Sequence, residues 1–313
     1  MAAGRTASAN DAMAALHGVS IFLFDGGQGA WSAFLDIASA YVMTVLENPR
    51  YPRNYKATLR TCSRKDEFIV KTTIWFDVIG SITMRKQPRL LSAIRELFDP
   101  NRSSISSHLM MLPIMGCESV VVWALAEASS LSCWKRSSNR KGTLSQRELV
   151  RKVEEIEIHL ERQAPLAQPH LEDTEAWSRL LTSQIFRSAT KLFLQSIANG
   201  NRPRVPEVRK CVDETFKCIV DFPNLVYNNK PALVRSTQAT LFGIFLCGSL
   251  TDDPIKKRLL SLHLQQKAEA DGVGNNLTVL QLLQQQWESS KRYPPRASVP
   301  WRKQLKQARV LLV

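Results

Sequence analysis

A glycine-rich segment near the start of the chain holds residue types that could do chemistry. The apolar run Ile21 to Phe24 is followed by Asp25-Gly26-Gly27-Gln28-Gly29. A strand, such a turn and a helix would together cradle a phosphate. However, the segment lacks the third glycine of the dinucleotide fingerprint and the Lys-Ser/Thr pair of a P-loop, and no further strand–helix units follow. We therefore expect a helix end with glycine just after it, then a turn into the next helix.

Cysteines are the second group of chemically capable residues. Cys117 and Glu118 could act as a nucleophile and a neighbouring acid, but no local pattern ties a histidine to them, and a catalytic cysteine needs a base. A cysteine at a helix entry explains this pair better. Cys211 and Cys218 lie seven residues apart and share a helix face, which offers too few ligands for zinc. We expect both to be buried thiols.

Acidic residues and histidine give two further candidates. Glu155 and His159 are spaced i, i+4, but the chain has no second ligand pair and no HExxH motif, so a solvated charged face is favoured. Asp252-Asp253 could hold magnesium as in all-α terpene synthases, but that motif needs an acid three positions after the pair, where Lys256 stands. An N-cap before Pro254 explains the pair. The sequence therefore assigns no catalytic residue, no metal ligand, no cofactor-binding residue and no cofactor.

Composition limits the kind of protein and its partners. The 313 residues are 44% hydrophobic, which suffices for one large helical domain or two smaller ones. Lys and Arg total 42 against 28 Asp and Glu, a net charge of +14, which favours polyanions or an anionic membrane surface. The surplus comes from dispersed segments such as 135–141, 202–210 and 291–309. The six cysteines form no C-x-x-C pair and no signal peptide opens the chain, so reduced thiols of an intracellular protein are expected.

The segment from Phe68 to Leu90 is the element around which the others are organised. Its apolar residues recur with helical spacing, and Trp75 and Phe76 are expected to fill the interior. Asp66 is the expected N-cap, Gly80 should loosen the helix, and Pro88 forbids its continuation. Lys71 and Asp77 interrupt the apolar run, which excludes a membrane span.

Helical periodicity predicts most of the remaining chain, so the expected fold class is all-α, a multi-helix array of antiparallel helices forming one large domain. Residues 1–20 are expected to form a disordered tail and residues 21–313 the domain, which would divide, if at all, near the basic linker 135–143. Residues 232–250 approach the length of a membrane span, but their Gln, Thr and Gly residues favour a buried helix. The other predicted helices cover about 30–47, 90–98, 119–134, a stretch after a capping box at 143–146, 173–199, a stretch from Pro206, and 275–287.

Several distinctive segments occur in order along the chain. They are Gly29-Ala30-Trp31, Trp75-Phe76-Asp77-Val78 with Pro88-Arg89, Met115-Gly116-Cys117 with Ala124-Leu125-Ala126-Glu127 and Trp134-Lys135, Ile185-Phe186-Arg187-Ser188-Ala189 with Val205-Pro206-Glu207, Leu246 to Pro254, and the late tryptophans Trp287 and Trp301. In this order they resemble the fungal-specific transcription factor domain, the regulatory region that follows a six-cysteine binuclear zinc cluster. Phe34 departs from the family, which often has histidine there.

The resemblance implies an all-helical regulatory domain that acts in the nucleus and controls metabolic or secondary-metabolite genes. It implies other transcription factors or the transcription machinery as partners, a small effector between helices, and leaves homo- or heterodimers open. The zinc cluster is not recognisable, since the first cysteine is Cys62, so only indirect or non-specific DNA contact is expected. The chain is then either a truncated or divergent member, or one that regulates through partners.

Two alternatives belong to other classes of protein. An all-α metabolic enzyme would need acids, histidines or cysteines gathered in a pocket, and the five histidines are dispersed. A basic peripheral membrane protein would need its Lys and Arg residues on one face beside exposed aromatic side chains.

Overall fold

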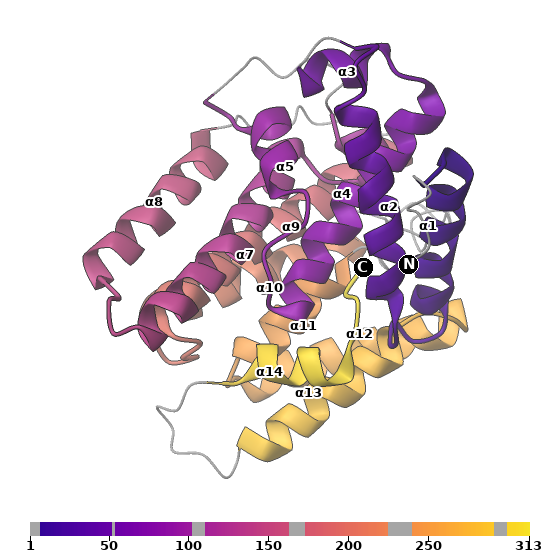
Figure 1. Ribbon diagram of the computed structural model, residues 1–313. Helices are drawn as coiled ribbons and strands as arrows, with labels where there is room; N and C mark the ends of the chain where they lie inside the picture. The colour runs from indigo at the N-terminus through magenta and orange to yellow at the C-terminus, as the bar shows by residue number, and fades with distance from the viewer. Residues whose placement is uncertain (1–6, 52–53, 102–109, 163–172, 225–239, 291–298) are drawn as a thin grey trace.

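The computed structural model is built from α-helices (Figure 1). It describes residues 7–51, 54–101, 110–162, 173–224, 240–290 and 299–313, and these residues form no β-strand beyond one isolated bridge between Gln28 and Val310. The helices are α1 (Ala9–Phe24), α2 (Trp31–Leu46), α3 (Tyr55–Thr61), α4 (Arg64–Met84), α5 (Leu91–Phe98), α6 (Leu112–Met115), α7 (Ser119–Arg140), α8 (Gln146–Arg162), α9 (Thr174–Asn199), α10 (Pro206–Asn224), α11 (Leu241–Leu250), α12 (Pro254–Asp271), α13 (Asn276–Ser290) and α14 (Trp301–Ala308). The expected all-α class is confirmed.

Helix α4 is the buried centre of this array. Every residue from Ile69 to Thr83 is buried, and the helix contacts α1, α2, α7 and α14. Many of these residues are β-branched and intrinsically poor helix formers, so packing on all sides holds the helix. Ser63 caps it by accepting from the Asp66 N–H at 3.1 Å, which corrects the expected cap at Asp66. Gly80 does not loosen the helix, which continues to Met84. A Cβ at this position would lie 2.8 Å from the Trp31 ring, so glycine allows α2 to approach α4 closely.

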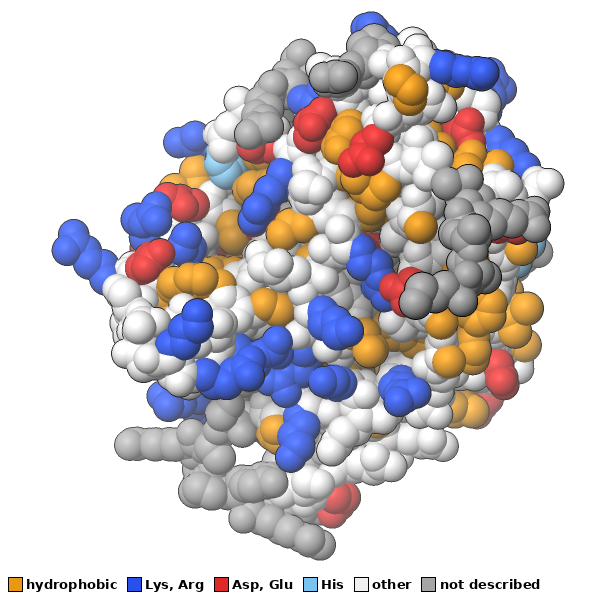
Figure 2. Space-filling model, in the orientation of Figure 1, with side chains coloured by type: hydrophobic (Ala, Val, Ile, Leu, Met, Phe, Trp, Pro, Cys, Tyr) orange, Lys and Arg blue, Asp and Glu red, His pale blue; other side chains and the backbone are white. Residues whose placement is uncertain are grey.

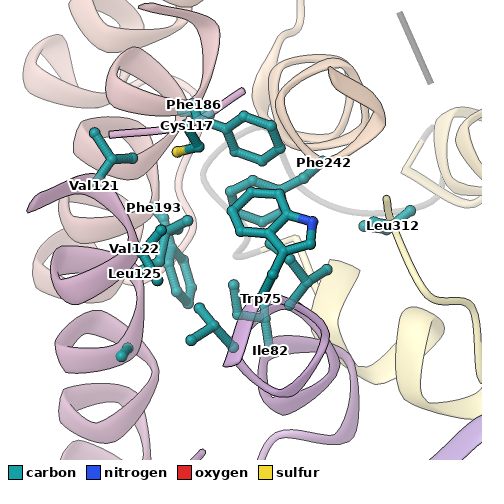
Figure 3. Close-up of a cluster of buried hydrophobic side chains, with 14 of the residues drawn as sticks. Trp75, Ile82, Cys117, Val121, Val122, Leu125, Phe186, Phe193, Phe242 and Leu312 are labelled. Carbon is teal, nitrogen blue, oxygen red and sulfur yellow. The ribbon is translucent and has the colours of Figure 1, made fainter. Parts of the chain in front are cut away.

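Aromatic rings link α4 to the C-terminal half of the chain (Figure 3). Trp75 meets Phe186 of α9 edge to face at 4.8 Å between ring centroids, and Phe186 stacks on Phe242 of α11 at 6.3 Å. Phe193 then contacts Trp301 of α14 at 5.8 Å. Each such pair adds about 0.5–1.5 kcal/mol beyond the buried area. The expectation that Trp75 fills the interior is confirmed.

The C-terminal segment closes the array against the glycine turn. The Trp31 indole N–H donates to the Arg309 carbonyl at 2.7 Å, and Thr83 donates its hydroxyl to the Val310 carbonyl at 2.7 Å. The Leu311 N–H donates to the Gly27 carbonyl at 2.9 Å. Hydrogen bonds therefore hold the C-terminal segment against the glycine turn, α2 and α4.

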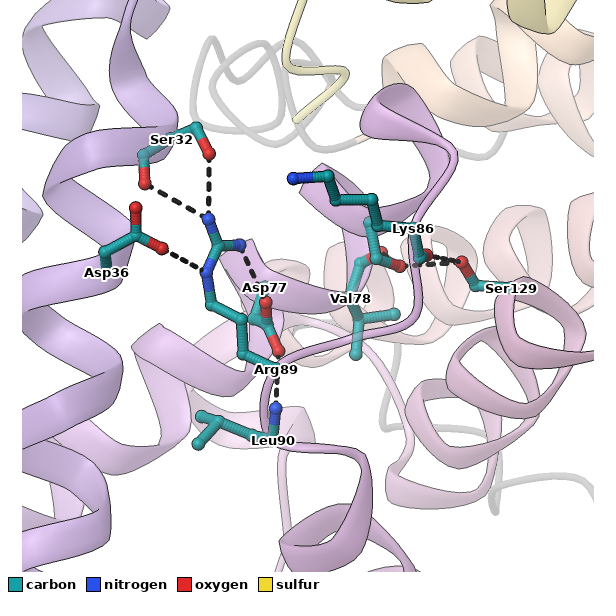
Figure 4. Close-up of polar contacts among 9 residues, drawn as sticks. Ser32, Asp36, Asp77, Val78, Lys86, Arg89, Leu90 and Ser129 are labelled. Atoms are coloured by element: carbon teal, nitrogen blue, oxygen red, sulfur yellow. Dashed lines mark hydrogen bonds and ion pairs between the residues drawn. The ribbon is translucent and has the colours of Figure 1, made fainter. Parts of the chain in front are cut away.

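A buried carboxylate fixes the turn that follows α4 (Figure 4). Asp77 is fully buried and accepts from the Leu90 N–H at 2.9 Å and from the Arg89 guanidinium at 3.1 Å. Arg89 also donates to Asp36 and to Ser32 of α2. Burial raises the pKa of Asp77, and the Leu90 N–H and Arg89 oppose that shift. One arginine therefore joins two helices and the turn.

Two expected boundaries are wrong. The tail expected over residues 1–20 is instead helical from Ala9, because Ser8 and Asp11 form a capping box and Ala12, Ala15, Leu16 and Val19 are buried against the core. The basic linker expected from residue 135 continues α7 to Arg140, since α7 packs on α8 and α9.

The glycine turn after α1 is confirmed, with Asp25 as C-cap and Gly26 in the left-handed region. The buried helix expected over 232–250 is confirmed from Leu241 to Leu250, and residues 232–239 lie outside the described residues.

Replacing Arg89 should destabilise the protein strongly. Arg89→Gln removes the charge that offsets buried Asp77, and breaking one partner of a buried pair costs on the order of 3 kcal/mol. The deficit should be larger at pH 7 than at pH 4, because without Arg89 the folded-state pKa of Asp77 rises further above its unfolded value, and protonation at low pH removes the buried charge. Denaturant unfolding at both pH values measures this.

Arg179→Gln is the matched control, because Arg179 pairs with exposed Glu175 on the surface. It should cost less than about 0.5 kcal/mol. An Arg89→Gln protein as stable as the control would show that Asp77 does not depend on the arginine.

Candidate functional site

The first candidate pair, Cys117 and Glu118, does not form a catalytic site. Cys117 is buried, and burial together with neighbouring Glu118 raises the pKa of its thiol well above the ordinary range. Glu118 accepts from the Arg187 guanidinium at 2.6 Å and from the Ser183 hydroxyl at 3.0 Å. The acid is therefore engaged with α9, and Cys117 stands at the entry of α7 as the sequence predicts.

The other chemical candidates serve structure. Asp253 caps α12 by accepting from the Ile255 N–H at 2.8 Å, and Lys256 lies 2.8 Å from its carboxylate, so the N-cap prediction is confirmed. Cys211 is buried in α10 as expected, but Cys218 is only half-buried, which corrects the expectation that both thiols are buried. Within the residues that the structure describes, no group of three or more His, Cys, Asp or Glu side chains could hold a metal ion. The glycine turn, the candidate phosphate site of the sequence, is bonded to the C-terminal segment, since the Gly27 carbonyl accepts from the Leu311 N–H.

A groove of about 650 Å³ lies between α5, α7 and α8. Figure 1 shows α8 beside α7 at the edge of the molecule. We call this hollow the α7–α8 groove. Its lining residues are Gln87, Arg95, Asn101, Trp123, Glu127, Ser130, Leu131, Trp134, Lys152, Glu155, Ile156 and His159.

Two indole rings with attendant polar groups form the walls of the groove. The Trp123 ring meets the His159 ring edge to face at 5.4 Å, and His159 lies 3.2 Å from the Asn101 amide. The Lys152 ammonium lies over the Trp134 ring at 5.4 Å. These contacts fix both rings in place, with Trp123 buried and Trp134 partly exposed at the groove.

The charges of the α7–α8 groove balance one another. Arg95 of α5 makes a bidentate pair with Glu127 of α7, with distances of 2.6 and 2.9 Å. Lys152 and Glu155 add one charge of each sign from α8. The lining acids and bases are therefore matched in number and largely engaged in ion pairs.

Sequence reasoning missed this groove because its residues come from separate helices. Glu155 and His159 were expected on a solvated face, and the structure places both at the groove, with Glu155 in an ion pair with Arg151. Glu127 and Trp134 are seven residues apart and lie on one face of α7. This spacing was the local pattern that could have indicated the groove. Arg95 and Gln87 carry no pattern that links them to α7.

None of the described helices has the length and hydropathy needed to cross a lipid bilayer.

Comparison with known proteins gives a consistent result. The model of the family described as "Fungal specific transcription factor domain" matches residues 2–313. The ustiloxin B cluster transcription factor ustR of Aspergillus flavus is 28% identical over 232 residues, which cover 71% of this chain and 37% of that protein. The transcription factor ntnD of a Nectria species is 28% identical over 197 residues, covering 55% of this chain and 32% of that protein.

A third relative, the transcription factor dibT of Pestalotiopsis microspora, is 30% identical over 95 residues, covering 30% of this chain and 15% of that protein. The matched segments thus span about a third or less of these relatives' own length. All three are named as transcription factors rather than enzymes. No solved structure matches the chain.

The buried thiols should resist alkylation in the folded protein. Burial raises the pKa of Cys247 to about 12 and that of Cys117 well above its ordinary range, so neither should react with iodoacetamide at pH 8. Cys62, Cys133 and Cys218 are half-buried and should be alkylated before them. Peptide mapping by mass spectrometry, before and after unfolding in guanidinium, measures the order. Alkylation of native Cys117 as fast as Cys133 would contradict its structural role.

Proposed function

This chain belongs to the fungal-specific transcription factor domain family, and from that premise we propose that it regulates transcription of the genes of a biosynthetic cluster. Support comes from its relatives, one of which is named as the transcription factor of the ustiloxin B cluster. The protein acts in the nucleus, through contacts with other transcription factors or the transcription machinery. Through this chain it contacts DNA indirectly or non-specifically, since the sequence contains no C-x-x-C pair of the kind that holds zinc in the family's DNA reader.

The observation that carries the mechanism is the α7–α8 groove, with two indole walls and balanced charges. We assign it to a small uncharged effector with a ring system, such as a product or precursor of the pathway that the cluster encodes. Apolar contact with the partly exposed Trp134 ring supplies affinity, and the exposed amides of Gln87 and Asn101 supply hydrogen bonds.

Binding there would join parts of the fold that otherwise touch little. Arg95 and Gln87 belong to α5 and to the turn after α4, whereas Lys152 and His159 belong to α8. A ligand that contacts both sides favours the arrangement in which α8 is held against the body of the domain. The exposed side of α8 then presents one defined surface to a partner.

Loss of the groove's aromatic wall should abolish regulation without unfolding the protein. In a fungal reporter strain, the chain fused to a heterologous DNA-binding domain should change reporter output, and Trp134→Ala should reduce that change at least fivefold. Trp287→Ala is the matched control, because Trp287 also lies under a lysine, Lys257, but outside the groove. Circular dichroism verifies folding of both variants. An equal loss of the reporter response in the two variants would show that the groove takes no part in regulation.

The purified chain should not recognise a promoter by itself. In a mobility-shift assay, cluster promoter DNA and scrambled DNA should bind with the same affinity, and binding should weaken steeply between 50 and 200 mM salt, because only phosphate contacts with Lys and Arg contribute. Preference for the promoter at 150 mM salt would show that this chain contains a DNA reader.

A further inference from the structure

A group of cations gathers where α4 ends and α14 begins, on the side of α7 away from the α7–α8 groove. Arg85 is the C-cap of α4, Arg136 lies in the last turns of α7, and Arg302 in the first turn of α14. All three interact electrostatically with the half-buried Cys133 thiol between them. We call Arg85, Arg136 and Arg302 the arginine cluster. Figure 2 shows Lys and Arg side chains gathered over the start of α14.

Arg302 lies at the base of the cluster and is short of partners. Its guanidinium lies over the Phe193 ring at 4.4 Å and the Trp301 ring at 4.9 Å, and Nη1 donates to Ser132. The Nε and Nη2 atoms are shielded from water and have no hydrogen-bond partner. Burial, together with Arg85 and Arg136, lowers the pKa of Arg302 to about 9, so the group is still charged at neutral pH.

The rim of the cluster is also cationic. Arg136 donates to the Arg85 carbonyl at 2.7 Å, and Lys135 donates to the Ile197 carbonyl. Burial lowers the pKa of Lys135, and Arg302 and Arg202 lower it further. Burial likewise lowers the pKa of Arg85, as does Arg136. These shifts mean that the fold gathers like charges at one point at a free-energy cost.

No described carboxylate offsets these charges. The ion pairs of the described chain leave out Arg85, Arg136 and Arg302, whose contacts go to carbonyls, a hydroxyl, a thiol and aromatic rings. A partly buried charge without a partner is costly, so natural proteins almost always pair it.

We propose that the arginine cluster binds the phosphate group of a small molecule. A phosphate ester carries about 1.5 to 2 negative charges at neutral pH, and guanidinium groups match its oxygens in pairs. Arg85 and Arg136 are partly exposed and supply the donors, while Arg302 supplies charge from below. The balanced charge of the α7–α8 groove does not fit such a ligand, so the two sites take different molecules.

A small ligand fits the geometry better than a nucleic-acid backbone does. The three arginines come from three helices and surround one thiol, with Arg136 Nη2 lying 3.8 Å from Cys133 Sγ. Nucleic acid binds to cations spaced along a stripe, because its phosphates follow one another along the strand. The cluster instead presents a single point of high charge.

The test is calorimetric titration of the full chain with sodium pyrophosphate and with inorganic phosphate, at an ionic strength held constant with sodium chloride. Wild type should bind pyrophosphate at one saturable site. Arg136→Gln and Arg85→Gln should each weaken binding at least tenfold, whereas Arg302→Lys, which keeps the positive charge below the site, should stay within about threefold of wild type. Arg179→Gln should stay within twofold of wild type.

Three results would overturn the assignment. The first is no saturable heat with wild type, and the second is a loss of affinity as large in Arg179→Gln as in the cluster variants. The third is competition by short duplex DNA at equal phosphate concentration, which would give the site to nucleic acid. Because Arg302→Lys alters a buried group, circular dichroism verifies its fold, and Arg85→Gln and Arg136→Gln test the proposal on their own.

Discussion

The buried Asp77 carboxylate and the Arg89 guanidinium that offsets it are the interaction on which the arrangement of the other elements depends. Asp77 holds the Leu90 N–H, so it sets where the chain leaves α4, and Arg89 ties that turn to α2. The turn also presents Arg85 to the arginine cluster and Gln87 to the α7–α8 groove. The hydroxyl of Ser129 donates to the Lys86 carbonyl at 3.0 Å, which fixes the same turn against α7 (Figure 4). One charge pair therefore positions residues of both sites.

The fold could be predicted where a helix carries its own periodicity and cap. Residues 173–199 form α9 as expected, with Asp173 accepting from the Ala176 N–H and Gly200 in the left-handed region after the last turn. The prediction failed where distant contacts decide the structure. Residues 135–140 read as a basic linker, but Lys135 donates to the Ile197 carbonyl and Arg136 to the Arg85 carbonyl, so tertiary contacts extend α7. The expected domain start at residue 21 is too late, because α1 begins at Ala9 and packs on α2 and α4.

Neither site could be derived from local patterns. The α7–α8 groove needs Arg95 beside Glu127 and Asn101 beside His159, pairs that lie 32 and 58 residues apart in the chain. Arg302 of the arginine cluster donates to Ser132, which lies 170 residues earlier in the chain. Periodicity reports which face of a helix is apolar, but not which face meets which partner. The net charge of +14 favoured polyanions or an anionic membrane surface, and it did not point to the arginine cluster, because Lys and Arg residues occur throughout the chain.

Helix α7 connects the two sites because its faces serve different neighbours. Trp123, Glu127 and Trp134 recur at helical spacing and line the groove. Cys133 and Arg136 lie three residues apart on another face and meet the end of α4. A ligand on either face therefore restrains the same last turns of α7. If the two ligands interact through α7, thermodynamic linkage requires each of them to change the affinity of the other by the same factor.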